Sequence, residues 1–320
     1  MNQPDLSLDS QNNESIVLVE LLSQLQQYAY VHTTVTPLTH ARVNARPENA
    51  WAHDLCGIFG WNRPFDKEVL PAEIFERMQQ AGIIERYENG WRSQVRVSSL
   101  GKLLFVHSAF PTSEADAVFF GPDTYRFADA IRQELERKIP FQRAVDIGCG
   151  AGPGAVLLAL ARPEAEVLAV DINDKALVMT QINALHNGAS NLQACRSNLL
   201  NNVAGDFDLV IANPPYLVDP AERAYRHGGG PLGAQLAMDI IDAAMQRLAP
   251  GGILLLYTGV AMINDSDPFL TAAKKRLEAA NASWSYREMD PDIFGEELAG
   301  GCYTQADRIA AVVLRAEKPV

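Results

Sequence analysis

Paired cysteines are missing from this chain. Its four cysteines lie far apart, and no two of them form a CxxC pair: Cys56, Cys149, Cys195 and Cys302. The sequence therefore supports neither a zinc site nor a disulfide framework. Unpaired thiols are typical of proteins in a reducing compartment, so we expect a cytoplasmic protein that binds no metal.

Long apolar runs are also missing. No stretch approaches the ~20 consecutive apolar residues that a membrane-spanning helix needs, so we expect no membrane association. Residues 1–15 are polar and acidic, and they contain neither the basic nor the apolar region of a secretory signal. We expect a disordered tail over residues 1–14.

Positive charge is scarce. The chain has 27 lysines and arginines against 39 aspartates and glutamates, which gives a net charge of −12. Proteins that bind nucleic acids usually carry a basic face that neutralises phosphates. The balance therefore favours a protein or a small molecule as the partner, although a local basic patch would keep a nucleic acid open.

The first part of the chain, residues 15–111, combines helices with a hairpin. Apolar residues at helical spacing predict helices over residues 16–30 and 70–83. The pair Asn89-Gly90 separates two β-prone runs and is a strong hairpin signal. We expect a smaller α+β, winged-helix-like domain that binds the substrate or forms a dimer, with nucleic-acid binding as the alternative. The remaining strand candidates of this part are 84–88, 91–97 and 103–106.

From residue 112 to residue 320 the pattern changes to strands alternating with helices, which predicts a doubly wound, mostly parallel sheet. We expect an α/β fold with a seven-stranded, Rossmann-like domain. A helix over residues 124–138 joins it to the first part of the chain. The strand candidates are 143–147, 166–171, 192–196, 207–212, 253–260, 283–289 and 308–314. The helix candidates between them are 154–161, 174–187, 236–248 and 268–280.

The first strand of this domain runs into a glycine-rich turn. Gly148, Gly150 and Gly152 permit positive φ and let a ligand touch the backbone, and the following helix offers unpaired N–H donors. The second strand ends at Asp171, followed by Ile172. A carboxylate at this position can accept hydrogen bonds from both hydroxyls of a ribose, so the pattern predicts a nucleotide-like cofactor.

Two cofactors compete for this turn. The register Gly150-x-Gly152-x-x-Ala155 nearly matches the dinucleotide fingerprint, and Asp171 suits NAD as well. However, Asp146 lies two residues before the first glycine. A carboxylate there fits a cofactor with a positive amino-acid end better than a pyrophosphate. S-adenosylmethionine carries an α-ammonium and a sulfonium, so the sequence favours it over NAD.

The tetrapeptide Asn213-Pro214-Pro215-Tyr216 follows the fourth strand. Two prolines cannot continue a strand, so the chain leaves the sheet at the strand's carboxyl end, where ligands bind in open α/β sheets. The Asn213 amide and the Pro214 carbonyl are acceptors for a planar NH2 group, on which the ring of Tyr216 would stack. A simple strand-ending turn is the alternative.

With these motifs, residues 118–314 resemble the class I S-adenosylmethionine-dependent methyltransferases with an Asn-Pro-Pro-Tyr motif. The segment is most similar to the protein-(glutamine-N5) methyltransferases and to their small-domain relatives that act on ribosomal or transfer RNA. The resemblance implies that Asp171 binds the ribose, and that Asn213 and Pro214 accept hydrogen bonds from the target nitrogen. It implies a methionine-binding set of Asp146, Gly148, Gly150 and Gly152.

The resemblance also has departures. Where the family often places an acidic residue against the adenine amine, this chain has Asn198, whose amide oxygen can accept the same bond. The first part of the chain does not match the helical substrate-binding domain of the release-factor enzymes, which implies a different target.

Two further segments are functional candidates. The stretch 121–126 resembles the Pro-Asp-Thr segment that borders cofactor and substrate in the glutamine methyltransferases, so Tyr125 and Arg126, together with Pro215, are predicted to contact the substrate. An ordinary turn with a helix cap is the alternative. The glycine-rich segment 225–233, which contains His227, predicts a mobile lid over the substrate; a plain long loop is the alternative.

Three functions therefore stay open. The first, which we favour, is an N-methyltransferase that acts on an amide nitrogen of a protein (glutamine-like) or of a small molecule. The second is the same chemistry on the exocyclic amine of an RNA base. The third is a non-catalytic, cofactor-binding interaction module. The sequence fixes neither the acceptor molecule nor the oligomeric state.

Overall fold

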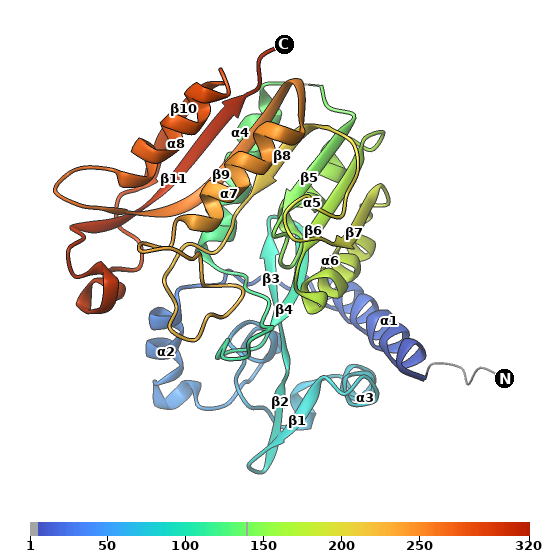
Figure 1. The fold of residues 1–320 in the computed structure, drawn as a ribbon. Coiled ribbons are helices and arrows are strands. Elements are labelled where there is room, and N and C mark those ends of the chain that lie inside the picture. The colour runs from blue at the N-terminus through green and yellow to red at the C-terminus, as the bar shows by residue number, and fades with distance from the viewer. Residues whose placement is uncertain (1–5, 139) are drawn as a thin grey trace.

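The computed structural model describes residues 6–138 and 140–320, and Figure 1 shows two parts. We call residues 6–111 the N-terminal module and residues 112–320 the C-terminal domain, at the boundary that the sequence predicts. Among the residues that the structure describes, no helix is both long and apolar enough to cross a membrane.

The C-terminal domain is built on one seven-stranded sheet. All strand pairs in it are parallel except those that involve β11. The α/β fold with a seven-stranded, mostly parallel sheet is thereby confirmed. In order across the sheet, the strands are β10 (Ser283–Asp290), β11 (Arg308–Glu317), β9 (Leu248–Met262), β8 (Phe207–Ala212), β5 (Arg143–Ile147), β6 (Glu166–Asp171) and β7 (Leu192–Arg196).

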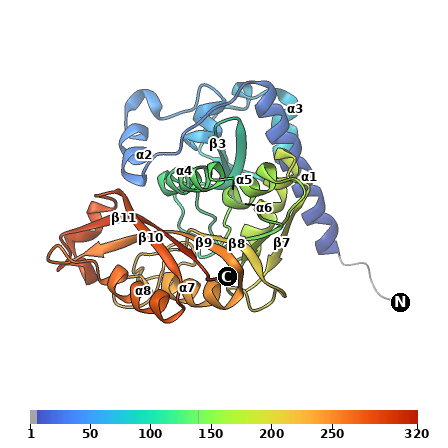
Figure 2. The same ribbon diagram turned by 90° about the horizontal axis from the view of Figure 1, so that it is seen from above.

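Helices cover both faces of this sheet, as Figure 2 shows from above. The central strands β5 and β8 are apolar on both sides because both faces are covered. One face carries α4 (Pro122–Glu136), α5 (Pro153–Ala161) and α6 (Asp174–Asn187), and the other carries α7 (Gln235–Arg247) and α8 (Pro268–Ala279). Short helical turns lie at Pro47–Asn49, Cys56–Gly60, Lys67–Val69, Gly295–Ala299 and Gly301–Tyr303.

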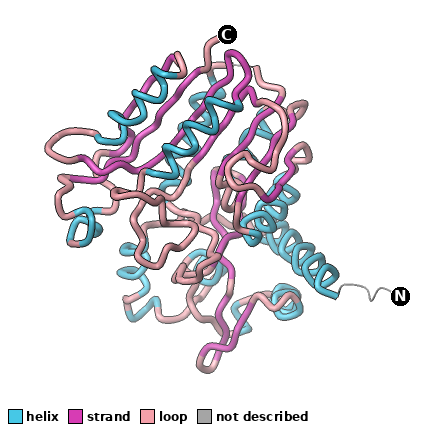
Figure 3. Tube along the Cα trace, viewed as in Figure 1, coloured by secondary structure: helices cyan, strands magenta, loops and turns pink. Residues whose placement is uncertain are grey.

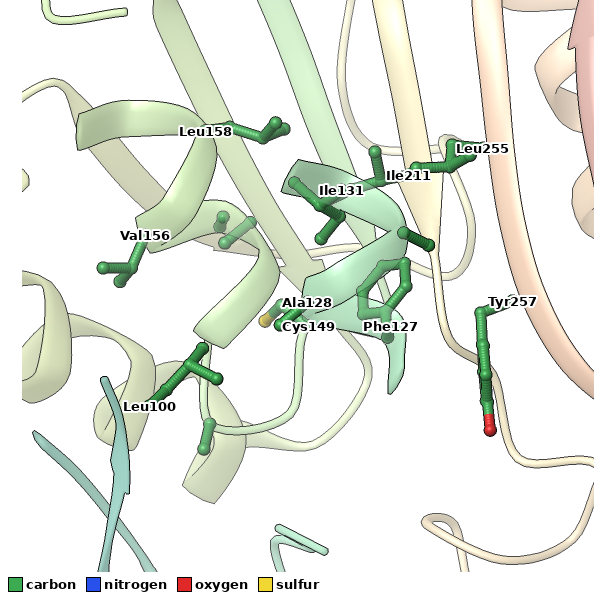
Figure 4. Packing of buried hydrophobic residues seen from close by; sticks show 14 of the residues in the cluster. Leu100, Phe127, Ala128, Ile131, Cys149, Val156, Leu158, Ile211, Leu255 and Tyr257 are labelled. Carbon is green, nitrogen blue, oxygen red and sulfur yellow. The ribbon is translucent and has the colours of Figure 1, made fainter. Parts of the chain in front are cut away.

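The apolar layer under α4 fixes where that helix begins. Phe127 and Ile131 of α4 pack in one cluster with Ile211 of β8 and Leu255 of β9, as Figure 4 shows. All four side chains are at most 3% exposed, and interiors of this kind are close-packed. The first turn of α4 is therefore held near the carboxyl end of β8, beside the middle of β9.

The N-terminal module contains three helices and two separate hairpins. Its helices are α1 (Leu6–Gln27), α2 (Pro37–Asn44) and α3 (Ala72–Gln80). The predicted helix over 16–30 corresponds to α1, which begins earlier, so residues 6–14 of the predicted tail are helical; residues 1–5 lie outside the described residues. The helix α2 was not predicted.

The hairpin predicted at Asn89-Gly90 is present, but its turn lies one residue earlier. The strands β1 (Ile84–Tyr87) and β2 (Gly90–Ser93) pair around a turn at Glu88-Asn89, so Gly90 is already in a strand. A side chain at Gly90 would collide with Trp51, which explains the glycine.

The predicted strand 91–97 is broken after Ser93. The hydroxyl of this residue binds the backbone N–H and carbonyl of Val95, and such local bonds compete with a strand ladder. The chain then continues as β3 (Val95–Leu100), which pairs with β4 (Leu103–Ser108) in a separate sheet. The likeness to a winged helix stays a prediction.

The module is joined to the C-terminal domain through α6. Asn183 of α6 is fully buried. Its side-chain oxygen accepts the N–H of Val106 in β4 at 2.8 Å, and its nitrogen donates to the Val106 carbonyl at 3.0 Å. The same nitrogen donates to the carbonyl of Ala151 at 2.8 Å. One amide therefore connects the module to the glycine-rich turn.

Candidate active site

The carboxyl end of the sheet opens into a cavity of about 220 Å³. Figure 3 shows that loops gather here, between the sheet and the N-terminal module. The predicted site residues that line this cavity are Asp146, Gly148, Gly150, Asp171, Ile172, Asn198, Asn213, Pro214, Pro215 and Tyr216. We call the part around residues 146–172 the donor end and the part around residues 213–216 the acceptor end.

The turn after β5 leaves its backbone open. Gly148 and Gly150 have φ of +71° and +55°, the left-handed region that side chains rarely adopt. A side chain built at either position would meet no protein atom. Their backbone is therefore free for close approach by a ligand.

Asp146 presents an unsatisfied carboxylate oxygen at the donor end. The residue is 2% exposed. Its Oδ2 accepts the N–H of Ala155 at 3.0 Å, while Oδ1 is buried without a hydrogen-bond partner among the described residues. Burial, with a smaller contribution from Asp171, raises the pKa of Asp146 to about 7. A buried acceptor without a partner is costly, and a cationic ligand group would satisfy it.

Asp171 ties the end of β6 to the glycine-rich turn. Its Oδ2 accepts the N–H of Gly150 at 3.0 Å, and its Oδ1 accepts the N–H of Asn173 at 2.9 Å. Burial raises the pKa of this carboxyl. Beside it, Ile172 is 52% exposed, which is high for a large apolar side chain, and Asn198 is exposed at the same rim.

The acceptor end offers two free hydrogen-bond acceptors. Asn213 is half-buried and Pro214 is buried. Neither the side-chain amide of Asn213 nor the carbonyl of Pro214 has a hydrogen-bond partner within residues 6–138 and 140–320. Both residues line the cavity, so the two groups predicted to hold an NH2 are not used by the fold itself.

Tyr216 is held by its hydroxyl. The residue is 7% exposed, and its hydroxyl donates to Oδ2 of Asp123 at 2.6 Å. The hydroxyl of Tyr257 donates to Oδ1 of the same carboxylate, also at 2.6 Å. The predicted stacking of Tyr216 on an acceptor stays a prediction, because the structure explains the hydroxyl without it.

Four predicted site residues do not line the cavity. Tyr125 accepts the N–H of Thr34 through its hydroxyl at 2.9 Å, which ties α4 to the N-terminal module. His227 accepts the N–H of Asp219 through Nδ1 at 3.1 Å. Each of these two side chains therefore bonds a backbone N–H of another segment near the cavity. The other two residues are Arg126, which is ion-paired to Asp123 and Asp290, and Gly152, whose close neighbour is Thr180.

The glycine-rich segment after the motif has two roles in the structure. Tyr225 and Arg226 form part of the cavity wall. Gly228 packs so closely on the motif that a side chain there would meet the Pro215 carbonyl and the Tyr216 Cα at 2.7 Å each. This glycine is explained by close packing, and the mobile lid stays a prediction.

Other cavity residues escaped the sequence analysis. Asp123 lies in the stretch 121–126, from which the sequence predicts only Tyr125 and Arg126 as site residues, and it lines the cavity. Phe119, Phe294 and Pro37 of α2 also line the cavity. Phe294 and Pro37 lie far from the motifs along the chain, so no local pattern could have identified them. Phe119 stands two residues before the stretch 121–126, but an apolar side chain there has no functional signature of its own.

The comparisons with known proteins agree with this geometry. The family model described as the methyltransferase small domain matches residues 126–266. This part of the chain, less than half of its 320 residues, is therefore similar to the methyltransferase small domain family. The predicted class I methyltransferase, with its enzyme class and its donor S-adenosylmethionine, is confirmed for this part of the chain.

Three similar proteins illustrate the range of the relatives. A release factor glutamine methyltransferase of Deinococcus radiodurans is 33% identical over 197 residues, 58% of this chain and 66% of that protein. Ribosomal RNA small subunit methyltransferase C of Mannheimia succiniciproducens is 30% identical over 171 residues, 52% of this chain and 44% of that protein. The solved M. jannaschii tRNA m1G37 methyltransferase has a TM-score of 0.47 at 17% identity, covering 71% of this chain and 57% of that one.

The chain spans 66% and 53% of the length of two release factor glutamine methyltransferases, from Deinococcus radiodurans and Escherichia coli. The family model matches residues 126–266, so the N-terminal module lies outside that match. The family therefore does not fix what the whole chain methylates.

Proposed function

We propose that this protein transfers a methyl group from S-adenosylmethionine to the nitrogen of a planar NH2 group, and that the acceptor is an amide of a protein, glutamine-like, or of a small molecule. One observation carries the proposal: a single cavity brings the free carboxylate oxygen of Asp146 together with the free acceptors of Asn213 and Pro214.

The donor end fits the cofactor. The open backbone of Gly148 and Gly150 and the unpartnered oxygen of Asp146 would hold the cationic amino-acid end. Asp171 would accept the ribose hydroxyls, and Ile172 would lie under the adenine, which would cover its exposed side chain. When bound, S-adenosylmethionine supplies a methyl group on a sulfonium, which is an electrophile for nitrogen.

The acceptor end suits a weak nucleophile. The nitrogen of an amide has a delocalised lone pair, so it must be oriented. The Asn213 oxygen and the Pro214 carbonyl would each accept one N–H, which holds the NH2 group in place and stabilises the positive charge that develops on nitrogen. The methylated nitrogen is acidic and releases its proton to water, so no strong base is required.

Charge at the acceptor end favours a protein or a small molecule over RNA. The arginines beside the site are already paired with carboxylates: Arg126 with Asp290 at 2.7 Å, Arg223 with Asp219 at 2.6 Å, and Arg226 with Glu297. Paired guanidinium groups are poor phosphate ligands, and the chain carries a net charge of −12. The release factor glutamine methyltransferase similarity points the same way.

An RNA base amine is the second candidate acceptor. The similarity to ribosomal RNA small subunit methyltransferase C favours it, because an exocyclic amine is also planar and would use the same two acceptors. The N-terminal module, which differs from the release-factor enzymes, is the part expected to select between these targets.

A label-transfer experiment tests the proposal. Purified protein is incubated with methyl-tritiated S-adenosylmethionine and a total lysate, with its small molecules retained, and the products are digested with nuclease or with protease before separation. We expect label that survives nuclease and becomes small after protease. The matched control is Asn213→Ala, which should bind the cofactor and transfer little label.

The other outcomes are decisive as well. Label that is released by nuclease would establish RNA as the acceptor. Cofactor binding by calorimetry without label in any fraction, including the small-molecule fraction, would reject the enzymatic proposal and favour a cofactor-sensing interaction module.

A further inference from the structure

Residues 213–216, which are proposed to bind the acceptor, are hardly held by backbone hydrogen bonds. The ladder of β8 ends at Ala212. In the described part of the chain, no backbone–backbone hydrogen bond is made by Pro214, Pro215 or Tyr216. The next backbone contact is at Leu217, whose N–H donates to the Arg226 carbonyl at 3.1 Å. Something other than the sheet must fix this segment.

The side chain of Tyr216 supplies that support. Its ring packs directly on the backbone of Gly259 in β9, where an added side chain would meet the ring at 2.3 Å. It also meets Phe294 edge-on, with 5.8 Å between ring centroids. The hydroxyl ends on Asp123. The ring is thus held on two sides and at its tip.

Asp123 is built to receive this hydroxyl. Its carboxylate is 4% exposed and lies in the first turn of α4, where the helix dipole favours a negative charge. It accepts the hydroxyls of Tyr216 and Tyr257 at 2.6 Å each and one N–H of Arg126 at 3.1 Å. The start of α4 is fixed by the apolar packing of Figure 4, so the carboxylate stands on a rigid element.

The second tyrosine reaches the same carboxylate from the neighbouring strand. β8 and β9 pair Ala212 with Leu256, so Tyr257 of β9 comes next to the position of Asn213. Its side chain is fully buried, and Figure 4 shows its hydroxyl at the end of the apolar layer. The segment after β8 and the middle of β9 are therefore tied to one carboxylate beside the cavity.

We infer that Asp123 is a positioning residue: through the hydroxyl of Tyr216 it sets where Asn213 and Pro214 stand relative to the methyl donor. The effect on catalysis rests on the proposed function, whereas the fixing of the motif by the bond between Tyr216 and Asp123 does not. Burial, followed by the neighbouring Asp123 carboxylate, raises the pKa of Tyr216 well above its ordinary range. The phenol therefore stays protonated and the carboxylate is the acceptor.

Loss of the bond between Tyr216 and Asp123 should impair methyl transfer more than cofactor binding. Displacing a reacting group by about 1 Å can lower a rate about 100-fold, whereas the donor end does not depend on this bond. We expect Tyr216→Phe and Asp123→Asn to lower label transfer by about 10- to 100-fold. The dissociation constant of S-adenosylhomocysteine should stay within about two-fold.

A matched control is present in the same domain. Tyr286 of β10 donates to Oδ2 of Asp267 at 2.5 Å, and neither residue lines the cavity. Tyr286→Phe therefore removes a phenol–carboxylate bond of the same kind at a distance from the site. It should leave transfer and cofactor binding unchanged.

A readout that needs no acceptor completes the test. Protein labelled with ¹⁵N in its asparagine side chains gives one amide signal for Asn213, identified by its loss in Asn213→Asp. With S-adenosylhomocysteine bound, this signal should shift or broaden in Tyr216→Phe and Asp123→Asn but not in Tyr286→Phe. Either variant suffices if the other does not fold.

An unchanged Asn213 signal, or normal transfer, in the folded anchor variants would overturn the inference. If the parent protein labels no fraction at all, the proposed function fails, and the amide signal still decides whether Asp123 fixes the motif.

Discussion

The donor end and the acceptor end of the cavity are assembled in different ways. The donor end comes from one continuous stretch, residues 146–172, and uses backbone groups and two carboxylates on neighbouring parallel strands. The acceptor end collects side chains from separate segments, among them Asp123, Tyr225, Phe294 and Pro37 of the N-terminal module. Under the proposed function, the first arrangement would suit a constant cofactor, and the second would let separate segments change independently with the target.

Removing the amide at the acceptor end should have the largest effect. We expect Asn213→Ala to lower single-turnover methyl transfer by about 2–4 kcal/mol of transition-state stabilisation, or roughly 30- to 1000-fold. Cofactor affinity, measured by calorimetry with S-adenosylhomocysteine, should hardly change. If cofactor affinity fell as much as methyl transfer, Asn213 would be a cofactor-binding residue, and the division into a donor end and an acceptor end would be wrong.

Asp171→Ala should show the opposite pattern. Losing a charged acceptor of ribose hydroxyls should weaken cofactor binding by about 1.5–3 kcal/mol, roughly 10- to 150-fold, with transfer at saturating cofactor largely retained. The control is Asp174→Ala, which removes a carboxylate three residues away that is 74% exposed. Equal effects of the two substitutions would contradict a specific ribose contact.

The pH dependence of cofactor binding should report on Asp146. Because burial raises its pKa to about 7, the free protein must lose a proton from Asp146 to bind a cationic group. Affinity should therefore fall by up to about tenfold per pH unit below pH 7. In Asp146→Asn this dependence should vanish, with weaker binding at pH 8. Calorimetry between pH 5.5 and 8.5 is the measurement.

The same raised pKa has a consequence for stability. A carboxyl whose folded pKa lies above its unfolded value stabilises the fold at low pH, and this contribution is lost as the pH rises through about 7. Cofactor-free Asp146→Asn should therefore unfold at a higher temperature than the parent protein at pH 8. A lower unfolding temperature would mean that the carboxylate has a partner in the free protein.

The smallest effect is expected in the N-terminal module. Burial, followed by the nearby Arg96, lowers the pKa of His40 to about 4, and its Nε2 has no partner among the described residues. His40→Phe should change the free energy of unfolding by less than about 1 kcal/mol at pH 7.5. Transfer and cofactor affinity should not change.

At lower pH the free energies of unfolding of the parent protein and of His40→Phe should differ. The unfolded parent chain takes up a proton on His40 below about pH 6.5, while the folded chain resists until about pH 4. The parent therefore loses stability over this range, and His40→Phe should lose less. Denaturant unfolding at pH 7.5 and pH 5 gives the comparison.

A region is predicted well from the sequence where its structure is determined by neighbouring residues in a recognisable pattern. The strands β5, β6, β7 and β8 begin and end at the predicted residues. For β6 and β8 the reason is a mostly apolar run that is closed by a local turn. The glycine-rich turn and the double proline also act locally. In the N-terminal module, by contrast, Ser93 interrupts a β-prone run through its own hydroxyl, which hydrophobic pattern does not reveal.

The site follows the same rule. Asp146, Asp171 and Asn213 can be found from the sequence because they stand next to strand ends. The role of Asp123 could not be found, since its two tyrosine partners are 93 and 134 residues away along the chain. Tyr125 and Arg126 stay predicted substrate contacts; in the structure Tyr125 bonds Thr34, and Arg126 is paired with Asp123 and Asp290.

The buried amide of Asn183 gives the molecule a thermodynamic property. It bridges a strand of the module and the carbonyl that follows Gly150. Any coupling of binding through this amide would be reciprocal: a partner docked on the module would change the affinity of the turn for its ligand by the same factor as the ligand changes the affinity for the partner.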